Sequence, residues 1–175
     1  VKKSKTMRIK TKNTADTQKL ARIFAQNLPE NGAFVSLFGD IGAGKTAFVR
    51  FVLKDLGVKE KITSPSFVIL NEYKGARVQS SDILVYHFDL YRLEDDGLDT
   101  IKEELREYSK DNVLTFVEWA DFGGGELPYN RLNIKVYYEE NDYDDTRYYE
   151  FEPVGKKYEI FVQKINTQAA KEGLK

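Results

Sequence analysis

A short glycine-rich segment carries the clearest chemical signal in the sequence. Residues 39–46 read Gly-Asp-Ile-Gly-Ala-Gly-Lys-Thr and fit the pattern G-x-x-x-x-G-K-[ST]. Glycines let such a loop turn its backbone N–H groups toward phosphate oxygens, and a following helix adds the positive end of its dipole. We therefore predict that residues 39–46, the glycine loop, bind a nucleoside phosphate. The candidate binding residues are Asp40, Ile41, Gly42, Ala43, Gly44, Lys45, Thr46 and Ala47.

Two side chains of the glycine loop have expected chemical roles. Lys45 supplies a point charge for the β- and γ-phosphates, and the Thr46 hydroxyl is a ligand for Mg²⁺. The flanking sequence has the required pattern, with an apolar run before the loop and a helical period after it. A glycine-rich turn that matches by chance is therefore the weaker alternative.

Two carboxylates are candidates to complete the site. Asp89 and Glu118 each end an apolar run, at residues 83–88 and 113–117. Mg²⁺ takes oxygen ligands and keeps several waters, so one hydroxyl with one or two carboxylates makes a suitable shell. We predict that Asp89 and Glu118 share the roles of metal ligand and water-orienting carboxylate, and the sequence does not decide which does which.

Three further residues near these motifs allow two interpretations each. His87 lies inside a strand pattern, so a packed histidine is favoured over a catalytic base. Ser66 is either a loop cap or part of a switch segment whose hydroxyl senses the γ-phosphate or the metal. Trp119 directly follows Glu118 and is either a core residue or an interface anchor.

The hydrophobic pattern predicts the elements that position these residues. The helix expected at residues 14–28 has Thr14 or Asp16 as its candidate cap, and a turn is expected at Lys74–Gly75. The order of the elements predicts an α/β layer fold with a mixed sheet. Expected strands span residues 7–11, 33–38, 67–73, 83–90, 113–119, 131–138 and 146–151, and expected helices span 14–28, 45–56, 98–108 and 158–170.

Composition excludes several classes of protein. The chain has 175 residues, 27 basic and 28 acidic, with one histidine and no cysteine. Disulfide frameworks, cysteine-based zinc sites and multi-histidine metal sites are therefore excluded. A net charge of −1 gives no global field that would hold nucleic acid. The guanine-reading motif N-K-x-D is missing from the sequence, which favours adenine as the base.

Length and hydropathy predict the organisation of the chain. At roughly 150 residues per domain, 1–175 is expected to be one domain. No apolar run approaches the ~18 residues of a membrane span, so we expect a cytoplasmic protein without membrane association. Val1 is an unusual first residue and Met7 is a candidate start, so residues 1–6 are expected to be a processed end, an added segment or disordered.

Four motifs in order resemble the TsaE family, formerly YjeE, from about residue 14 to residue 128. They are the glycine loop, Thr-Ser-Pro-Ser-Phe at 63–67, His-Phe-Asp-Leu-Tyr-Arg-Leu at 87–93, and Val-Glu-Trp at 117–119. The resemblance implies a P-loop NTPase-like three-layer fold with a mixed parallel and antiparallel sheet. It also implies ATP and Mg²⁺ as cofactors and TsaB and TsaD as partners. In that family ATP hydrolysis is thought to reset the complex that modifies ANN-decoding tRNA, so contact with tRNA is expected to be indirect.

The resemblance also assigns roles residue by residue. Lys45 and Thr46 correspond to the phosphate and metal residues, and Asp89 and Glu118 to the acidic pair. Further switch or partner positions are Ser66, Tyr91, Arg92 and Trp119. The sequence departs from the family at three of its motif positions. Ser66 stands where the family usually has Thr, Ala47 where it has a second Thr or Ser, and Ala120 where it often has Pro.

The expected activity is Mg²⁺-dependent ATP hydrolysis that is weak in the isolated protein and stimulated by partners. Catalysis in such sites is mostly positioning and charge stabilisation, and a partner can complete the site. Two alternatives stay open. One is a small-molecule phosphotransferase that uses the same loop, and the other is a nucleotide-gated binding module with little catalysis.

Overall fold

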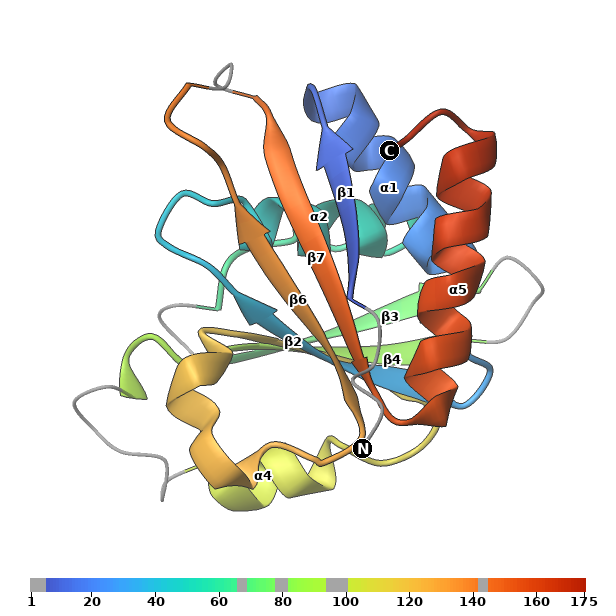
Figure 1. Ribbon diagram of the computed structural model, residues 1–175. Coiled ribbons are helices and arrows are strands. Elements are labelled where there is room, and N and C mark those ends of the chain that lie inside the picture. The colour runs from blue at the N-terminus through green and yellow to red at the C-terminus, as the bar shows by residue number, and fades with distance from the viewer. Residues whose placement is uncertain (1–5, 66–68, 78–81, 94–100, 142–144) are drawn as a thin grey trace.

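The computed structural model describes residues 6–65, 69–77, 82–93, 101–141 and 145–175. These residues form a seven-stranded sheet with the order β1-β7-β6-β2-β5-β4-β3 (Figure 1). Strand β2 is parallel to β5 and β6, and β4 is parallel to β5, whereas the other neighbours are antiparallel. The predicted α/β fold with a mixed sheet is confirmed. The strands are β1 (Met7–Thr11), β2 (Gly32–Phe38), β3 (Leu70–Ala76), β4 (Asp82–Asp89), β5 (Val113–Glu118), β6 (Arg131–Tyr137) and β7 (Arg147–Val154).

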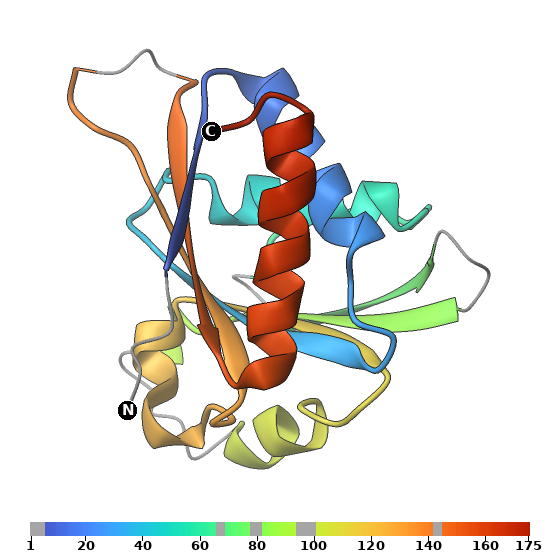
Figure 2. The ribbon, with the colours of Figure 1, turned by 45° about the vertical axis from the view of Figure 1, so that its right-hand side comes forward.

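Helices cover both faces of the sheet. On one face lie α1 (Thr14–Gln26), α2 (Lys45–Asp55) and α5 (Lys156–Lys171), and on the other lie α4 (Lys102–Glu107) and the 3₁₀ segment η2 (Ala120–Glu126). Figure 2 shows α1, α2 and α5 together on one side of the strands. Helices on both faces make three layers, and they explain why β2 and β5 read as continuous apolar runs.

The larger core lies between the sheet and the three long helices. Phe24 of α1 contacts Phe48 of α2 and Phe161 of α5, with ring centroids 5.6 and 4.9 Å apart. All three side chains are buried. Truncating a buried phenylalanine to alanine typically costs about 3–5 kcal/mol of stability. This cluster therefore fixes α2, and with it the residues at the start of α2, against the sheet.

Most predicted elements are confirmed within a few residues, and two local predictions are wrong. Asn13 caps α1, because its side-chain oxygen accepts the Asp16 N–H at 2.9 Å. Asp16 and Thr14 therefore lie inside the helix. Lys74 and Gly75 lie within β3 and pair with Leu84 and Ile83 of β4.

Gly75 shows why a dipeptide typical of turns can occupy a strand. A Cβ at this position would lie 3.0 Å from the Leu56 carbonyl oxygen, so glycine permits the close approach of the end of α2. Two other predictions fall partly on residues outside the described ranges. They are the strand at 67–73, of which the described part begins at Leu70, and the helix at 98–108, of which Lys102–Glu107 is described.

The sheet topology brings three segments to one edge. Asp89 and Glu118 are partners in the parallel β4–β5 pair, and Glu118 is also the partner of Leu37 in the β2–β5 pair. The carboxyl ends of parallel strands meet at the same edge, which is where α/β folds place their ligands. The glycine loop leaves β2 at this edge and leads into α2. No helix of the described ranges is long and apolar enough to cross a membrane.

Candidate functional site

The glycine loop connects β2 to α2 and depends on two of its glycines. Gly39 has φ +138°, and a Cβ there would lie 2.2 Å from the Val136 carbonyl oxygen of β6. Gly44 has φ +106° and stands at the start of α2, where no side chain caps the helix. The N–H groups of the first helical turn are therefore available to an anion.

Lys45 is the first residue of α2, and its ammonium group points back across the loop. Its Nζ donates to the carbonyl oxygens of Gly39 and Asp40 at 2.5 and 3.0 Å, and it lies 4.1 Å from the centroid of the Trp119 ring. Only 4% of Lys45 is exposed. Burial lowers the pKa of the Lys45 amino group, and the Glu118 and Asp89 carboxylates oppose that shift.

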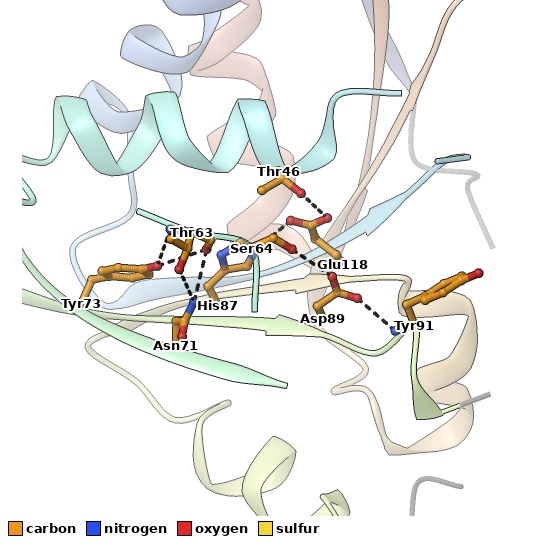
Figure 3. A network of polar contacts seen from close by, with 9 residues as sticks. All are labelled: Thr46, Thr63, Ser64, Asn71, Tyr73, His87, Asp89, Tyr91 and Glu118. Atoms are coloured by element: carbon orange, nitrogen blue, oxygen red, sulfur yellow. Dashed lines mark hydrogen bonds and ion pairs between the residues drawn. The ribbon is translucent and has the colours of Figure 1, made fainter. Parts of the chain in front are cut away.

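A chain of hydrogen bonds joins α2 to the ends of β5 and β4. The Thr46 hydroxyl donates to Glu118 Oε2 at 2.8 Å, and His87 Nε2 lies 2.7 Å from Glu118 Oε1 (Figure 3). His87 and Glu118 are both buried. His87 is thus a packed histidine, as its strand pattern predicts, and it also holds a carboxylate of the site. Its other ring nitrogen, Nδ1, has no hydrogen-bond partner in the described part of the chain.

Asp89 is held from two directions. Its Oδ1 accepts the Tyr91 N–H at 3.0 Å, and its Oδ2 accepts the Ser64 hydroxyl at 3.3 Å (Figure 3). The segment that carries Ser64 is fixed in turn by Asn71, whose side-chain amide donates to the Thr63 carbonyl oxygen at 3.2 Å. The two acidic side chains therefore lie side by side, but each has its own partners.

These groups line one cavity of about 500 Å³. Tyr91 lies at its rim with 43% of its surface exposed, and its ring is 4.9 Å from that of Trp119. Trp119 itself has φ +56°, which is an uncommon backbone conformation for a bulky residue. The described lining residues are Ile41, Gly42, Gly44, Lys45, Thr46, Ala47, Ser64, Asp89, Tyr91, Arg92, Glu118 and Trp119.

The cavity thus brings together most of the candidate residues, with three exceptions. Asp40 lines a second cavity of about 580 Å³, which shares Trp119 with the first. Ala43 is buried behind the loop, with 1% of its surface exposed. Ser66 lies outside the described residues.

Sequence reasoning missed the contacts made by Ser64 and Arg147. Ser64, rather than Ser66, is the described hydroxyl that reaches Asp89, and the two serines could not be told apart by composition. Arg147 Nε donates to the Ala43 carbonyl oxygen at 2.9 Å from a strand 104 positions away. In the sequence Arg147 has only an acidic run beside it, which gives no signal of this contact.

The residues of this cavity fit a magnesium nucleotide. Among the described residues there is no group of three or more His, Asp or Glu side chains that could hold a metal ion alone. Thr46 and Glu118 offer two hard oxygen ligands next to a cation and an open helix N-terminus. Mg²⁺ is typically held in this way, by one or two protein oxygens together with phosphates and water.

Comparison with known proteins agrees with this geometry. The family model described as threonylcarbamoyl adenosine biosynthesis protein TsaE matches residues 11–148. The tRNA threonylcarbamoyladenosine biosynthesis protein TsaE of Bacillus subtilis is 32% identical over 162 residues, which cover 93% of this chain and 95% of that protein. The protein of the same name from Haemophilus influenzae is 34% identical over 135 residues, covering 74% of this chain and 76% of its own.

A solved structure is similar in fold as well. The crystal structure of YdiB from Bacillus subtilis superposes with a TM-score of 0.72 and 29% identity, covering 94% of this chain and 96% of YdiB. The match of the family model spans the glycine loop and both acidic strand ends, and it reaches Arg147 at the start of β7. This chain belongs to the TsaE family of threonylcarbamoyl adenosine biosynthesis proteins.

Proposed function

We propose that this chain is a Mg²⁺-dependent ATPase and an accessory subunit of the complex that makes threonylcarbamoyladenosine in tRNA. One observation carries the proposal: Lys45, the Thr46 hydroxyl and the Glu118 carboxylate converge on one cavity at a helix N-terminus. Membership of the TsaE family supports the pathway. The cofactors are ATP and Mg²⁺, and the compartment is the cytoplasm.

The proposed roles follow from the contacts of each side chain. Lys45 and the N–H groups of the first turn of α2 balance the charge of the β- and γ-phosphates. Glu118 is the proposed metal-side carboxylate, because it already bonds the Thr46 hydroxyl. Asp89, held by Ser64 and the Tyr91 N–H, is the proposed water-orienting carboxylate. Bound Mg²⁺ would neutralise charge on the phosphate oxygens.

The exposed apolar and aromatic side chains at the rim of the cavity favour contact with a protein partner. Ile41 of the glycine loop is 71% exposed and Tyr91 is 43% exposed, and both line the cavity. The cations that line the cavity among the described residues are Lys45 and Arg92. We therefore expect slow hydrolysis by the chain alone and faster hydrolysis with a TsaB–TsaD pair seated on this rim. Contact with tRNA is proposed to be indirect, through that pair.

ATP hydrolysis by the purified chain tests the enzymatic part of the proposal. Turnover should need Mg²⁺, stop on chelation, and disappear in Lys45→Ala, while Lys54→Ala on the exposed side of the same helix stays active. An unchanged rate in Lys45→Ala would contradict the assignment. ADP release that depends on a small-molecule acceptor would instead favour a phosphotransferase. ATP binding without turnover, alone or with partners, would favour a nucleotide-gated module.

A further inference from the structure

Arg147 contacts the glycine loop from outside the cavity. Its Nε donates to the Ala43 carbonyl oxygen at 2.9 Å, and a Cβ at Gly44 would lie 3.7 Å from the same nitrogen. Of the described residues, the cavity lining includes Gly42 and Gly44 but neither Ala43 nor Arg147. The guanidinium therefore lies behind the loop, on the side away from the predicted phosphate position.

The position of Arg147 is itself well fixed. It is the first residue of β7, which lies between β1 and β6, and it pairs with Thr11 of β1. Its Nη1 donates to the Thr146 carbonyl oxygen at 2.7 Å, and its guanidinium carbon is 5.2 Å from the Tyr138 ring centroid. A donor held in this way can hold the carbonyl that it contacts.

The contact between Arg147 and the Ala43 carbonyl also constrains the Gly44 N–H, which belongs to the same peptide group. The Ala43–Gly44 peptide is trans and planar, so the Gly44 N–H points away from the Ala43 carbonyl. Because Arg147 holds that carbonyl behind the loop, the Gly44 N–H faces the cavity. This is the direction that a backbone donor needs in order to meet a phosphate oxygen.

We propose that Arg147 is a positioning residue that orients the Gly44 N–H for the diphosphate part of a bound nucleotide. The proposal deepens the proposed function and rests on it, since it presumes a nucleoside diphosphate in the cavity. It also gives a role to the strand that follows the four family motifs, because β7 holds the arginine. Arg147 touches neither the cavity nor the reacting atoms and is not a catalytic residue.

Binding of ADP with Mg²⁺ to purified variants tests the proposal. Arg147→Met keeps the length of the side chain and removes its donors, and Arg147→Lys keeps one cationic donor. Arg8→Met is the matched control, because Arg8 lies 4.2 Å from the Tyr148 ring centroid on the same sheet and contacts Glu139 rather than the loop. We expect Arg147→Met to weaken ADP binding about tenfold. The Kd for ADP of Arg147→Lys should stay within about threefold of that of the unmodified chain, and the Kd of Arg8→Met should be unchanged.

Two further readouts separate positioning from other roles. Arg147→Met should raise the KM for ATP by about the same factor as the Kd for ADP while kcat stays within about twofold, because the N–H would bind ground state and transition state alike. The Gly44 amide resonance of the nucleotide-free protein should shift in Arg147→Met and not in Arg8→Met. This second readout needs no nucleotide.

Several results would overturn the proposal. Unchanged ADP affinity in Arg147→Met, with or without a lower melting temperature, would reduce Arg147 to a packing residue and leave the proposed ATPase intact. A loss of kcat at unchanged affinity would make Arg147 a transition-state group instead. An unshifted Gly44 resonance would refute the orientation itself. If the unmodified chain binds no ADP, this proposal and the proposed function both fail.

Discussion

Thr46 and Glu118 lie 72 positions apart in the chain and are joined by a hydrogen bond of 2.8 Å between Thr46 Oγ1 and Glu118 Oε2. The bond links the start of α2 to the end of β5. It exists because β2 and β5 are parallel neighbours whose carboxyl ends meet at one edge. Both side chains offer oxygen ligands, so a magnesium ion at this point would be bound by groups that are already in contact.

Glu118→Gln should separate binding from turnover. The amide keeps the shape of the side chain and an oxygen that can accept the Thr46 hydroxyl, but it lacks the negative charge needed to hold a cation. We expect ADP binding to persist and ATP turnover to fall by roughly 100-fold or more. Glu126→Gln on η2, which removes only an ion pair with Arg106, is the control. Full activity in Glu118→Gln would exclude this carboxylate from the metal site.

His87→Ala should reduce both stability and turnover, because it removes the group that holds Glu118 Oε1 in a buried site. Loss of such a contact costs about 1–3 kcal/mol of unfolding free energy. His87→Gln can place an amide N–H near the same oxygen and should recover part of kcat. Tyr158→Phe, which loses a buried hydrogen bond to the Phe34 N–H outside the cavity lining, should reduce stability and keep kcat. Equal losses of kcat in the Tyr158 and His87 variants would argue against a specific role for His87.

Trp119 should report nucleotide binding by its fluorescence. It is the single tryptophan of the sequence, and the Lys45 ammonium lies 4.1 Å from its ring centroid. Phosphate that draws Lys45 away removes a cation from the ring face and so changes its emission. We expect ADP to change the Trp119 emission of the unmodified chain and to leave the emission of the Lys45→Met variant unchanged. Emission that stays constant while calorimetry shows ADP binding would mean that Lys45 does not leave the ring.

Tyr149 should make stability depend on pH in the alkaline range. Burial raises the pKa of its hydroxyl to about 12, above the value of about 10 for an unfolded chain. The contribution of the Tyr149 hydroxyl to the unfolding free energy is therefore fully present below pH ~10 and is lost as pH rises toward 12. Tyr149→Phe keeps the ring beside Phe48 and should reduce the fall in unfolding free energy between these pH values by about 1–3 kcal/mol. Tyr129→Phe, at a residue that is 81% exposed, should leave the fall unchanged.

The sequence predicted the parts of the fold that rest on local patterns. The glycine loop, its preceding strand and α2 follow from a motif and a hydrophobic period. The bounds of β2 and α2 lie within one residue of the expected ones. Strands β6 and β7 also follow from local patterns, which predicted strands at residues 131–138 and 146–151. Local signals failed where several polar residues are candidates for one helix cap, as with Asn13, Thr14 and Asp16 at the start of α1.

Contacts between distant segments could not be predicted from the residues alone. Nothing in the pattern around His87 says that its ring reaches Glu118, because strand alternation does not fix which neighbouring strand a side chain contacts. The same holds for Ser64 and Asp89 and for Arg147 and Ala43, whose meeting depends on sheet order and register. The motif located the site, and the strand order determined its supporting contacts.

The most direct test of the central claim is ATP hydrolysis by the pure protein, alone and with a purified TsaB–TsaD pair, with Lys45→Ala as the blank. We predict slow hydrolysis by the chain alone, strong stimulation by the pair, and no activity above background in the variant. Absence of stimulation, with ATP still bound, would contradict the proposed partnership. Equal rates with and without Lys45 would contradict the active site itself.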